Sequence, residues 1–171
     1  MKFNGNDIAT LMEKLLFMCI PTSRRRTIYI LKHKQKFHHI GDNLFWQPRK
    51  FPADPELISI GNNVKIASGV IFVNHDILHN LFNCMEKTTV FKPYEDCIKI
   101  GDNVMLGANA MILPGVSIGS NVVVAAGSIV TKDLPNNGVY GGCPAKEISY
   151  FPQLREKRRK ITGGGCRTLL A

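Results

Sequence analysis

Large aliphatic residues recur at every sixth position through the second half of this chain. An α-helix would repeat near 3.6 residues and a simple two-faced strand would alternate by two, so neither explains a period of six. Short strands joined by tight corners do explain it. The lead column contains Ile100, Leu106, Ile112, Ile118, Val124 and Val130, and a companion column of small or branched residues contains Val104, Ala110, Val116, Val122 and Ser128.

The same pattern occurs upstream of residue 76, where it marks the start of the repeat. Asn63, Asn103 and Asn121 recur near the expected corners, and asparagine tolerates the left-handed backbone of a tight turn. Three units of six close a triangular coil of about eighteen residues, with strands stacked about 4.8 Å apart. The sequence therefore predicts an all-β solenoid whose lead column forms the core. The upstream members are Ile60, Ile66 and Phe72, with Ile58, Val64 and Val70 beside them.

Three segments depart from the repeat. The phase breaks between Asp76 and Ile98, which predicts an extruded loop at 77–97. An amphipathic N-terminal helix, which Pro21 would stop, is expected to cap the open end of the solenoid or to pack in an oligomer. We divide a single domain into a cap and lead-in (1–39), a β-helix (40–150) and a basic tail (151–171). The apolar stripe of the helix contains Ile8, Leu11, Met12, Leu15, Leu16 and Cys19.

Composition narrows the classes of function. The formal net charge is +9, but the basic residues concentrate outside the repeat, in Arg24–Lys36 and Arg155–Lys160, without the interleaved aromatics of a nucleic-acid motif. This distribution favours attraction for an anionic small ligand over nucleic acid. The five cysteines are irregularly spaced, which favours a reducing compartment. With no apolar run long enough to span a bilayer and no secretory signal, we expect a cytoplasmic protein.

The motifs of the second half resemble those of the hexapeptide acyltransferases, specifically the galactoside, maltose and xenobiotic O-acetyltransferase branch. The resemblance covers roughly residues 40–150. It implies a left-handed parallel β-helix, acetyl-CoA as co-substrate, no metal, and transfer of an acetyl group to a sugar or polysaccharide hydroxyl. It also implies a homotrimer with sites between subunits. The motifs are Ile100-Gly101-Asp102-Asn103-Val104, Ala125-Ala126-Gly127-Ser128-Ile129-Val130-Thr131-Lys132-Asp133 and Gly141-Gly142-Cys143-Pro144-Ala145-Lys146.

The resemblance also implies catalytic roles. A single histidine of this family lies where the coil gives way to the loop, and Asn74-His75-Asp76 is at that break. His75 is therefore the expected general base, since an imidazole can take the proton of an attacking hydroxyl near neutral pH. The family's oxyanion donor is a backbone amide, which maps to Ala108. A carboxylate or a backbone carbonyl is expected to hold the other imidazole nitrogen; Asp76 is an adjacent candidate, although sequence neighbours often point apart.

Coenzyme and acceptor residues follow from the same match. Ala126 and Gly127 would leave room for the pantetheine arm, with Met105 in place of an aromatic found in some relatives. Thr131, Lys132 and Lys146 would meet the phosphates, although such lysines also occur as ordinary corner residues. The expected acceptor-binding residues are Trp46, Gln47, Arg49, His79 and Tyr94, and a core role for Trp46 is the alternative.

The sequence leaves four other functions open. Serine O-acetylation and nucleotide-sugar N-acetylation use related coils. A β-helical carbonic anhydrase would need three zinc ligands, and His75 and His79 would then require a third histidine from positions 33, 38 or 39. A non-catalytic solenoid that serves as a binding module is the last alternative.

Overall fold

The computed structural model describes residues 5–161, with side chains from residue 11 onward. Its strands form three sheets, here named A, B and C. In the order of hydrogen-bonded neighbours, sheet A contains β1 (His39–Ile40), β3 (Ile58–Ile60), β6 (Ile98–Ile100) and β9 (Ser117–Ile118). Sheet B contains β13 (Lys146–Tyr150), β12 (Gly138–Gly141), β10 (Val122–Val124), β7 (Val104–Leu106), β4 (Lys65–Ile66) and β2 (Phe45–Trp46). Sheet C contains β11 (Ile129–Val130), β8 (Met111–Ile112) and β5 (Ile71–Phe72).

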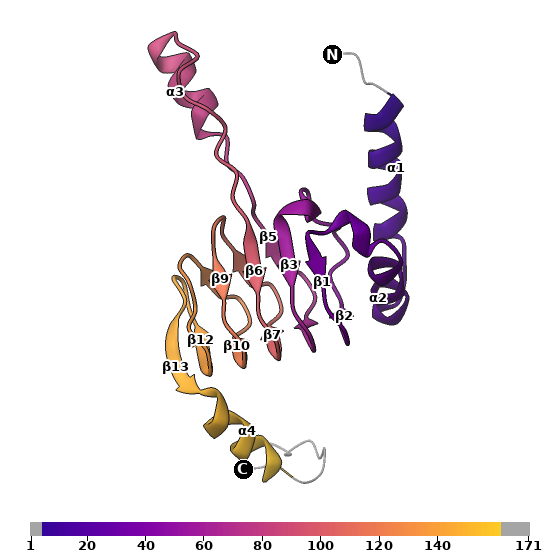
Figure 1. Ribbon diagram of the computed structural model, residues 1–171, viewed down its shortest axis with the longest axis vertical. Helices are drawn as coiled ribbons and strands as arrows, with labels where there is room; N and C mark the ends of the chain where they lie inside the picture. Colours follow the sequence, from indigo (N-terminus) through magenta and orange to yellow (C-terminus); the bar gives the residue numbers. More distant parts are fainter. Residues whose placement is uncertain (1–4, 162–171) are drawn as a thin grey trace, which may run out of the picture.

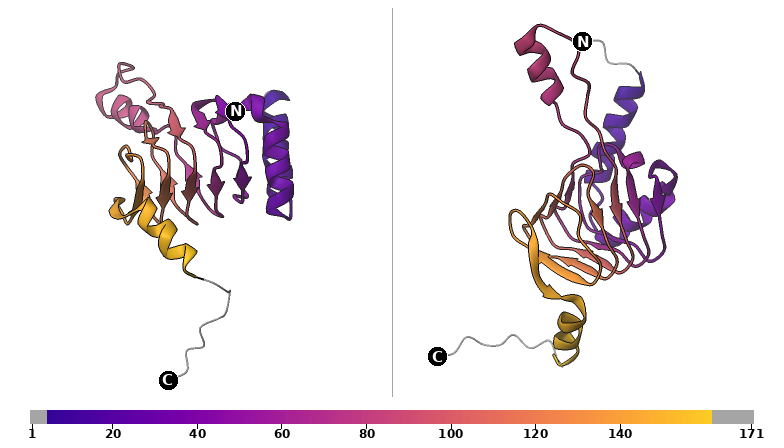
Figure 2. Two further views of the ribbon diagram at one scale, coloured as in Figure 1. Left: turned by 60° about the horizontal axis from the view of Figure 1, so that its bottom comes forward. Right: turned by 60° about the vertical axis from the view of Figure 1, so that its left-hand side comes forward.

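From β3 to β11 the chain visits sheets A, B and C in turn, and each return to a sheet adds a strand parallel to that of the turn before (Figures 1 and 2). Partners in successive regular turns lie eighteen residues apart, as in Lys99 with Ser117 and Met105 with Val123. The predicted parallel stacking is therefore confirmed. The antiparallel β12–β13 hairpin, which ends sheet B, was not predicted.

Side chains of both predicted columns point into the space between the sheets. Every one of them is at most 9% exposed, from Ile58 to Val130, and Ser128 is fully buried with its hydroxyl bonded to the Ala125 carbonyl at 2.8 Å. Burial of such aliphatic side chains contributes roughly 1.5–3 kcal/mol each before the entropy of ordering is subtracted. The core predicted from the period of six is confirmed.

An asparagine ladder runs along one corner of the coils. Asn63, Asn103 and Asn121 have φ between 55° and 57°, in the left-handed region. Each side-chain amide donates to the carbonyl oxygen of the next asparagine, at 2.8 Å from Asn63 to Asn103 and 3.0 Å from Asn103 to Asn121. Asn43 and Asn137 extend the ladder at its two ends. The recurrence of asparagine is therefore explained by both the backbone and the stacked amides.

Two helices, α1 (Gly5–Met18) and α2 (Ser23–Lys32), lie beside the first turn (Figure 1). The predicted apolar stripe does not cap the core of this chain, because Leu11, Met12, Leu15, Leu16 and Cys19 are exposed; packing in an oligomer stays a prediction. Among the described side chains of α1, Phe17 is buried instead, and its ring lies 5.2 Å from that of Tyr29 and 5.5 Å from that of Phe51. This anchor turns the predicted stripe outward. Ile8 lies outside the described side chains.

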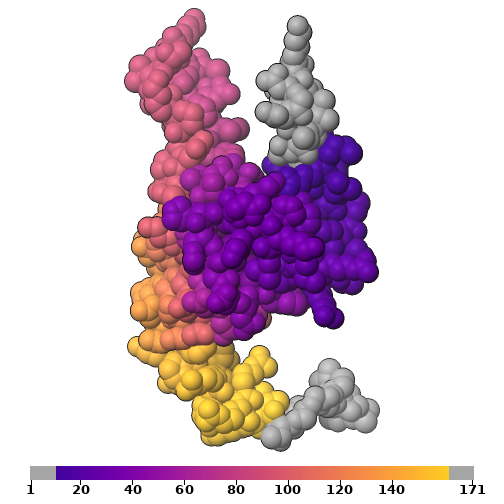
Figure 3. All heavy atoms as spheres, turned by 45° about the vertical axis from the view of Figure 1, so that its right-hand side comes forward, coloured from indigo at the N-terminus to yellow at the C-terminus, as the bar shows by residue number. Residues whose placement is uncertain are grey.

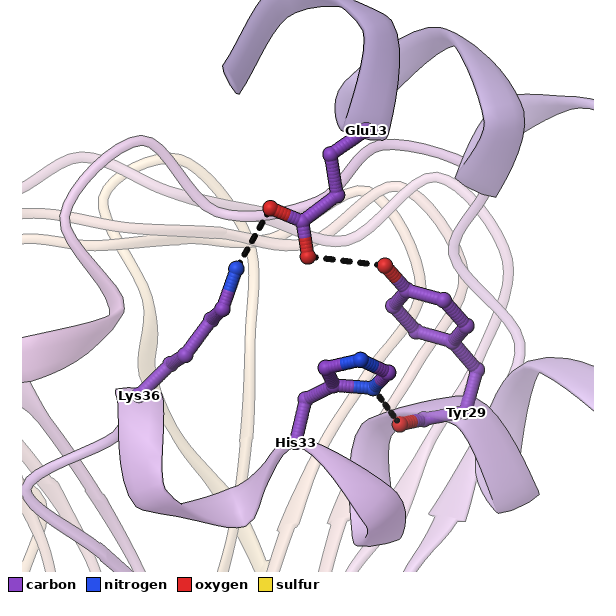
Figure 4. Close-up of polar contacts among 4 residues, drawn as sticks. All are labelled: Glu13, Tyr29, His33 and Lys36. Atoms are coloured by element: carbon purple, nitrogen blue, oxygen red, sulfur yellow. Dashed lines mark hydrogen bonds and ion pairs between the residues drawn. The ribbon is translucent and has the colours of Figure 1, made fainter. Parts of the chain in front are cut away.

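Polar contacts also fasten α1 to the lead-in (Figure 4). The Tyr29 hydroxyl donates to Glu13 at 2.7 Å, and Lys36, in the short 3₁₀ helix η1 (Lys34–Lys36), pairs with the same carboxylate. The Nδ1–H of His33 donates to the Tyr29 carbonyl at 2.8 Å. Hydrogen bonds from Lys36 and Tyr29 lower the pKa of Glu13, and burial together with Glu13 raises the pKa of Tyr29 to about 12.

The predicted loop 77–97 leaves the coils as an arm that carries α3 (Leu78–Glu86) near its tip (Figures 1 and 3). The described C-terminal part ends in α4 (Phe151–Arg159), a basic helix at the start of the predicted basic tail. Another 3₁₀ helix, η2 (Pro55–Leu57), precedes β3. Among the described residues, none of the helices combines the length and apolar character needed to cross a membrane.

Candidate active site

His75 lies just beyond β5, where the arm leaves the coil, and its side chain is 45% exposed. The imidazole Nδ1 is 2.7 Å from Oδ2 of Asp54. Because an ionised carboxylate only accepts, this contact places the proton on Nδ1 and leaves the Nε2 lone pair available. An imidazole held in this tautomer can accept a proton from a bound hydroxyl.

The carboxylate that holds His75 is Asp54 rather than the predicted Asp76. Oδ1 of Asp76 instead accepts the N–H of Leu78 at 3.0 Å, at the start of α3. Asn74 fixes the root of the arm: its carbonyl accepts the N–H of Asp96 at 2.9 Å and its amide donates to the Asp96 carbonyl at 3.3 Å. Hydrogen bonds thus hold both sequence neighbours of His75, Asn74 and Asp76, at the base of the arm.

Sequence reasoning missed Asp54 because it lies outside the repeat. The first turn has no strand in sheet C, and residues 48–57 take that place as an irregular segment that ends in η2. Paired residues of the first and second turns lie twenty positions apart in the sequence, as His39 and Ser59 do, whereas those of the regular turns lie eighteen apart. The two additional residues, together with Pro48, Pro52 and Pro55, are signals in the sequence that this side of the turn is irregular.

Three of the predicted coenzyme residues, Ala108, Ala126 and Gly127, lie at the corner between sheets B and C. Ala126 and Gly127 are exposed there, and a Cβ built on Gly127 would meet no atom within 4 Å. The N–H of Gly127 donates to the Ala108 carbonyl at 2.8 Å, which stacks the two corners. Among the described residues, the Ala108 N–H donates to no hydrogen-bond partner. An unpaired amide beside an open corner has the chemistry of an oxyanion donor.

The predicted phosphate contacts lie further along the coils. Thr131 and Lys132 follow β11 and Lys146 begins β13, and all three residues are exposed. Ala145 is joined to this part of the coil by its N–H, which donates to the Ile129 carbonyl at 2.8 Å. Met105 is exposed on sheet B. The structure leaves these side chains free for an extended anionic ligand without bringing them into a closed pocket.

Two of the predicted acceptor residues, Gln47 and Arg49, line a cavity of about 810 Å³ together with Asn109, the neighbour of Ala108. The sugar-stacking role proposed for Trp46 is wrong. Its ring is fully buried, 5.9 Å from that of Phe72, and its Nε1–H donates to the Pro48 carbonyl. The core alternative therefore holds for this residue, because a buried ring offers no face to a ligand.

The other two predicted acceptor residues belong to the arm. His79 is in α3, and its buried Nδ1 has no hydrogen-bond partner among the described residues. The Tyr94 hydroxyl donates to Asp96 at 3.2 Å, and this bond raises the pKa of Tyr94. Tyr94 also contributes its carbonyl to the N–H of Asp76. Both residues lie on the same side of the coil as His75.

Within one chain, the predicted site residues thus form two groups. His75, His79 and Tyr94 follow sheet C, as do the predicted phosphate contacts Thr131 and Lys132. Ala108, Gly127 and Gln47 precede it, at the corner between sheets B and C. Sheet C separates the two groups, so a single chain does not bring the base and the coenzyme corner together. Within residues 11–161, there is also no cluster of three or more His, Cys, Asp or Glu side chains suited to a metal ion.

Known proteins contain sequences similar to this repeat. Residues 97–132 match the hexapeptide repeat of succinyl-transferase. Galactoside O-acetyltransferase of Escherichia coli (strain K12) is 40% identical over 112 residues, which cover 64% of this chain and 52% of that protein. Protein CapG of Staphylococcus aureus is 50% identical over 112 residues, covering 63% of this chain and 60% of CapG. The chain spans just over half the length of these curated relatives.

A solved structure matches over most of both chains. The maltose O-acetyltransferase from Clostridium difficile 630 is 27% identical, with a TM-score of 0.58, and the match covers 86% of this chain and 91% of that one. A galactoside acetyltransferase solved with coenzyme A shares the fold, with a TM-score of 0.61 at 23% identity. The matched repeat and these relatives show that the chain is similar in sequence and in fold to hexapeptide-repeat acetyltransferases.

Proposed function

We propose that this protein transfers the acetyl group of acetyl-CoA to a hydroxyl group of a sugar or polysaccharide, with His75 as the general base. The single observation that carries the proposal is the hydrogen bond of 2.7 Å between His75 and Asp54, which leaves Nε2 to receive a proton. Nε2 takes the hydroxyl proton as the acceptor oxygen bonds to the thioester carbon. The carbon–sulfur bond then breaks, and the proton passes to the departing thiolate.

Ala108 supplies the oxyanion donor in this proposal. Its free N–H at an open corner would stabilise the negative charge that develops on the thioester oxygen. The coenzyme would begin at the same corner, with the pantetheine arm over Ala126 and Gly127, and would extend past β11 to place its phosphates near Thr131, Lys132 and Lys146. Support comes from the exposure of these residues and from the open space beside Gly127.

We infer that the coil is a left-handed parallel β-helix and that three copies assemble around it. The likeness to the maltose O-acetyltransferase supports the fold. The assembly is supported by the separation of His75 from the Ala108 corner, and by the exposed apolar residues on α1 and α3, which a neighbouring copy would cover. Sedimentation equilibrium would measure the mass, and a monomer would contradict the assembly. A cytoplasmic location stays a prediction, in keeping with the use of acetyl-CoA.

Mixing two inactive variants tests whether neighbouring copies share a site. His75→Ala removes the base, and Ala126→Trp fills the coenzyme corner at an exposed position. If each site takes its base and its coenzyme corner from different subunits, co-expression at equal levels restores about a quarter of the wild-type activity, because one interface in four pairs two intact halves. If both halves belong to one chain, no activity returns.

The reaction itself is tested by thiol release from acetyl-CoA across a panel of acceptors. Simple sugars, polysaccharide fragments, serine and an amino sugar nucleotide would be compared, and nuclear magnetic resonance of the product would locate the acetyl group. We expect acetylation of a sugar hydroxyl. Thiol release with the amine alone would overturn O-acetylation, and failure to release thiol with any hydroxyl acceptor would favour a non-catalytic solenoid.

A further inference from the structure

The cavity beside Gln47 and Arg49 is strongly cationic. It lies between the start of α2, the segment 47–50 and the corner 68–71, and its lining includes Arg26, Arg49 and Lys50 but no aspartate or glutamate. Val70 and Ile71 provide an apolar wall. Three cations with no carboxylate among them repel one another, so an anionic ligand would relieve the repulsion.

Arg26 is the least expected of these cations because it is only 6% exposed. One of its guanidinium nitrogens, Nη1, donates to the Ile20 carbonyl at 2.7 Å, but its buried Nε has no partner among the described residues. Buried guanidinium groups are ordinarily paired with a carboxylate or phosphate. Burial, and secondarily the nearby charge of Arg49, lowers the pKa of Arg26. This side chain is therefore incompletely paired within the described part of the chain.

The N-terminus of α2 adds an independent attraction for anions. Thr22 caps this ten-residue helix and Ser23 begins it, and both residues line the cavity. The first turn of α2 contains no acidic residue that would neutralise the positive end of the helix dipole. Helix dipole, hydroxyl groups and guanidinium groups thus converge on one space.

The position of the cavity indicates which ligand it serves. Asn109 belongs to its lining and directly follows Ala108, so the cavity adjoins the proposed acetyl end of the coenzyme. The proposed phosphate contacts, Thr131 and Lys132, lie beyond the next corner along the coils. The anionic group in this cavity would therefore belong to the acceptor.

We propose, on the basis of the proposed acetyl transfer, that the acceptor is an acidic saccharide whose carboxylate or phosphate group is bound by Arg26, Arg49 and the start of α2. The apolar wall of Val70 and Ile71 would pack against the sugar ring. The cavity thus gains a proposed anion subsite. The sequence analysis had predicted acceptor binding for only two of its residues, Gln47 and Arg49.

Equilibrium binding tests the subsite without depending on catalysis. Titration calorimetry at low salt would compare methyl glucuronide, methyl galacturonide and galactose 6-phosphate with the neutral methyl glucoside and methyl galactoside. At least one acidic sugar is expected to bind about 10- to 100-fold more tightly than its neutral counterpart, the range for charge-assisted hydrogen bonds. Equal affinity for acidic and neutral sugars, or no binding of any acidic sugar, would overturn the proposal.

Variants assign the binding to this cavity. Arg49→Gln and Lys50→Gln, at exposed positions where folding is not at risk, should each lower the affinity for the acidic sugar about tenfold. The matched control is Arg25→Gln. Arg25 is an exposed arginine of α2, the helix of Arg26, but it does not line the cavity, so this variant should leave the affinity for the acidic sugar unchanged. Arg26→Gln should have the largest effect, provided that its circular dichroism spectrum matches wild type.

Two further measurements separate the sources of an anion. A loss of coenzyme A affinity in Arg49→Gln would assign the cations to the coenzyme and overturn the proposal. Equally tight binding of inorganic phosphate and of the acidic sugar would also overturn it, because the cavity would then recognise the anion alone. If the acidic sugar binds as expected but no acceptor is acetylated, the subsite stands and the proposed function fails.

Discussion

The regular turns supply the backbone pairing and the core, whereas the segments outside the repeat supply the proposed catalytic side chains. From Ile98 to Val130, each turn places aliphatic side chains inside and repeats the same parallel pairing, so one pattern fixes the backbone and the core together. Residues 48–57 and 74–97 follow no period, yet they contribute Asp54 and His75, the two members of the proposed catalytic pair. Repetition therefore secures the scaffold, whereas the chemistry lies where repetition stops.

The largest expected effect concerns His75. His75→Ala should lower kcat/KM for thiol release by about 10²- to 10⁴-fold, because the acceptor hydroxyl would lose its general base. Circular dichroism should remain that of wild type, since the side chain is 45% exposed. His39→Ala, which removes an exposed histidine of β1, serves as the matched control and should retain activity. If both variants retained activity, the proposed chemistry would not lie at the break in the repeat.

A core substitution probes the regular turns instead. Ile112→Ala should reduce the free energy of unfolding by about 2–5 kcal/mol, because it leaves a cavity in a fully buried column. Ile71→Ala, in the adjacent strand β5, removes a side chain that is 41% exposed and should cost clearly less. Urea denaturation of both variants measures the difference. Similar losses would show that the lead column is not the main source of stability.

Asp54 tests whether the irregular first turn serves catalysis or only packing. Asp54→Asn should lower kcat about 10- to 100-fold while the KM for acetyl-CoA stays near wild type, because the amide no longer fixes the imidazole tautomer. Asp76→Asn is the control, since Asp76 bonds the N–H of Leu78 rather than His75. A larger loss in Asp76→Asn would reverse the assignment.

Prediction from the sequence succeeded where one rule governs many residues. The columns, the asparagine corners and the position of the arm follow from the period of six, and the structure confirms the burial and the parallel pairing. Asp54, Arg26 and the direction of the α1 stripe depend on single long-range contacts. Phe17 rather than Leu15 entered the core because the Tyr29 and Phe51 rings face it. No local pattern encodes such a pairing.

The smallest effect is expected at Glu13, where polar contacts rather than stacked columns hold the N-terminal helices. Lys36 and Tyr29 lower the pKa of Glu13 below its ordinary value of 4.5, so the ionised carboxylate favours the folded state. This contribution is complete above about pH 4.5 and disappears as the pH falls through the lower pKa of the folded protein. Glu13→Gln should therefore cost up to about 1 kcal/mol at pH 7, in the range of partly exposed ion pairs.

The difference between wild type and Glu13→Gln should shrink as urea titrations move from pH 7 into the acid range, because protonation removes the same charge from wild type. Glu156→Gln breaks the exposed pair with Arg159 and should change stability by less at every pH. A Glu13 effect that is independent of pH would mean that packing, rather than charge, joins α1 to the lead-in. The N-terminal helices would then be held by apolar packing, as the regular turns are, and the proposed difference between these two regions would be wrong.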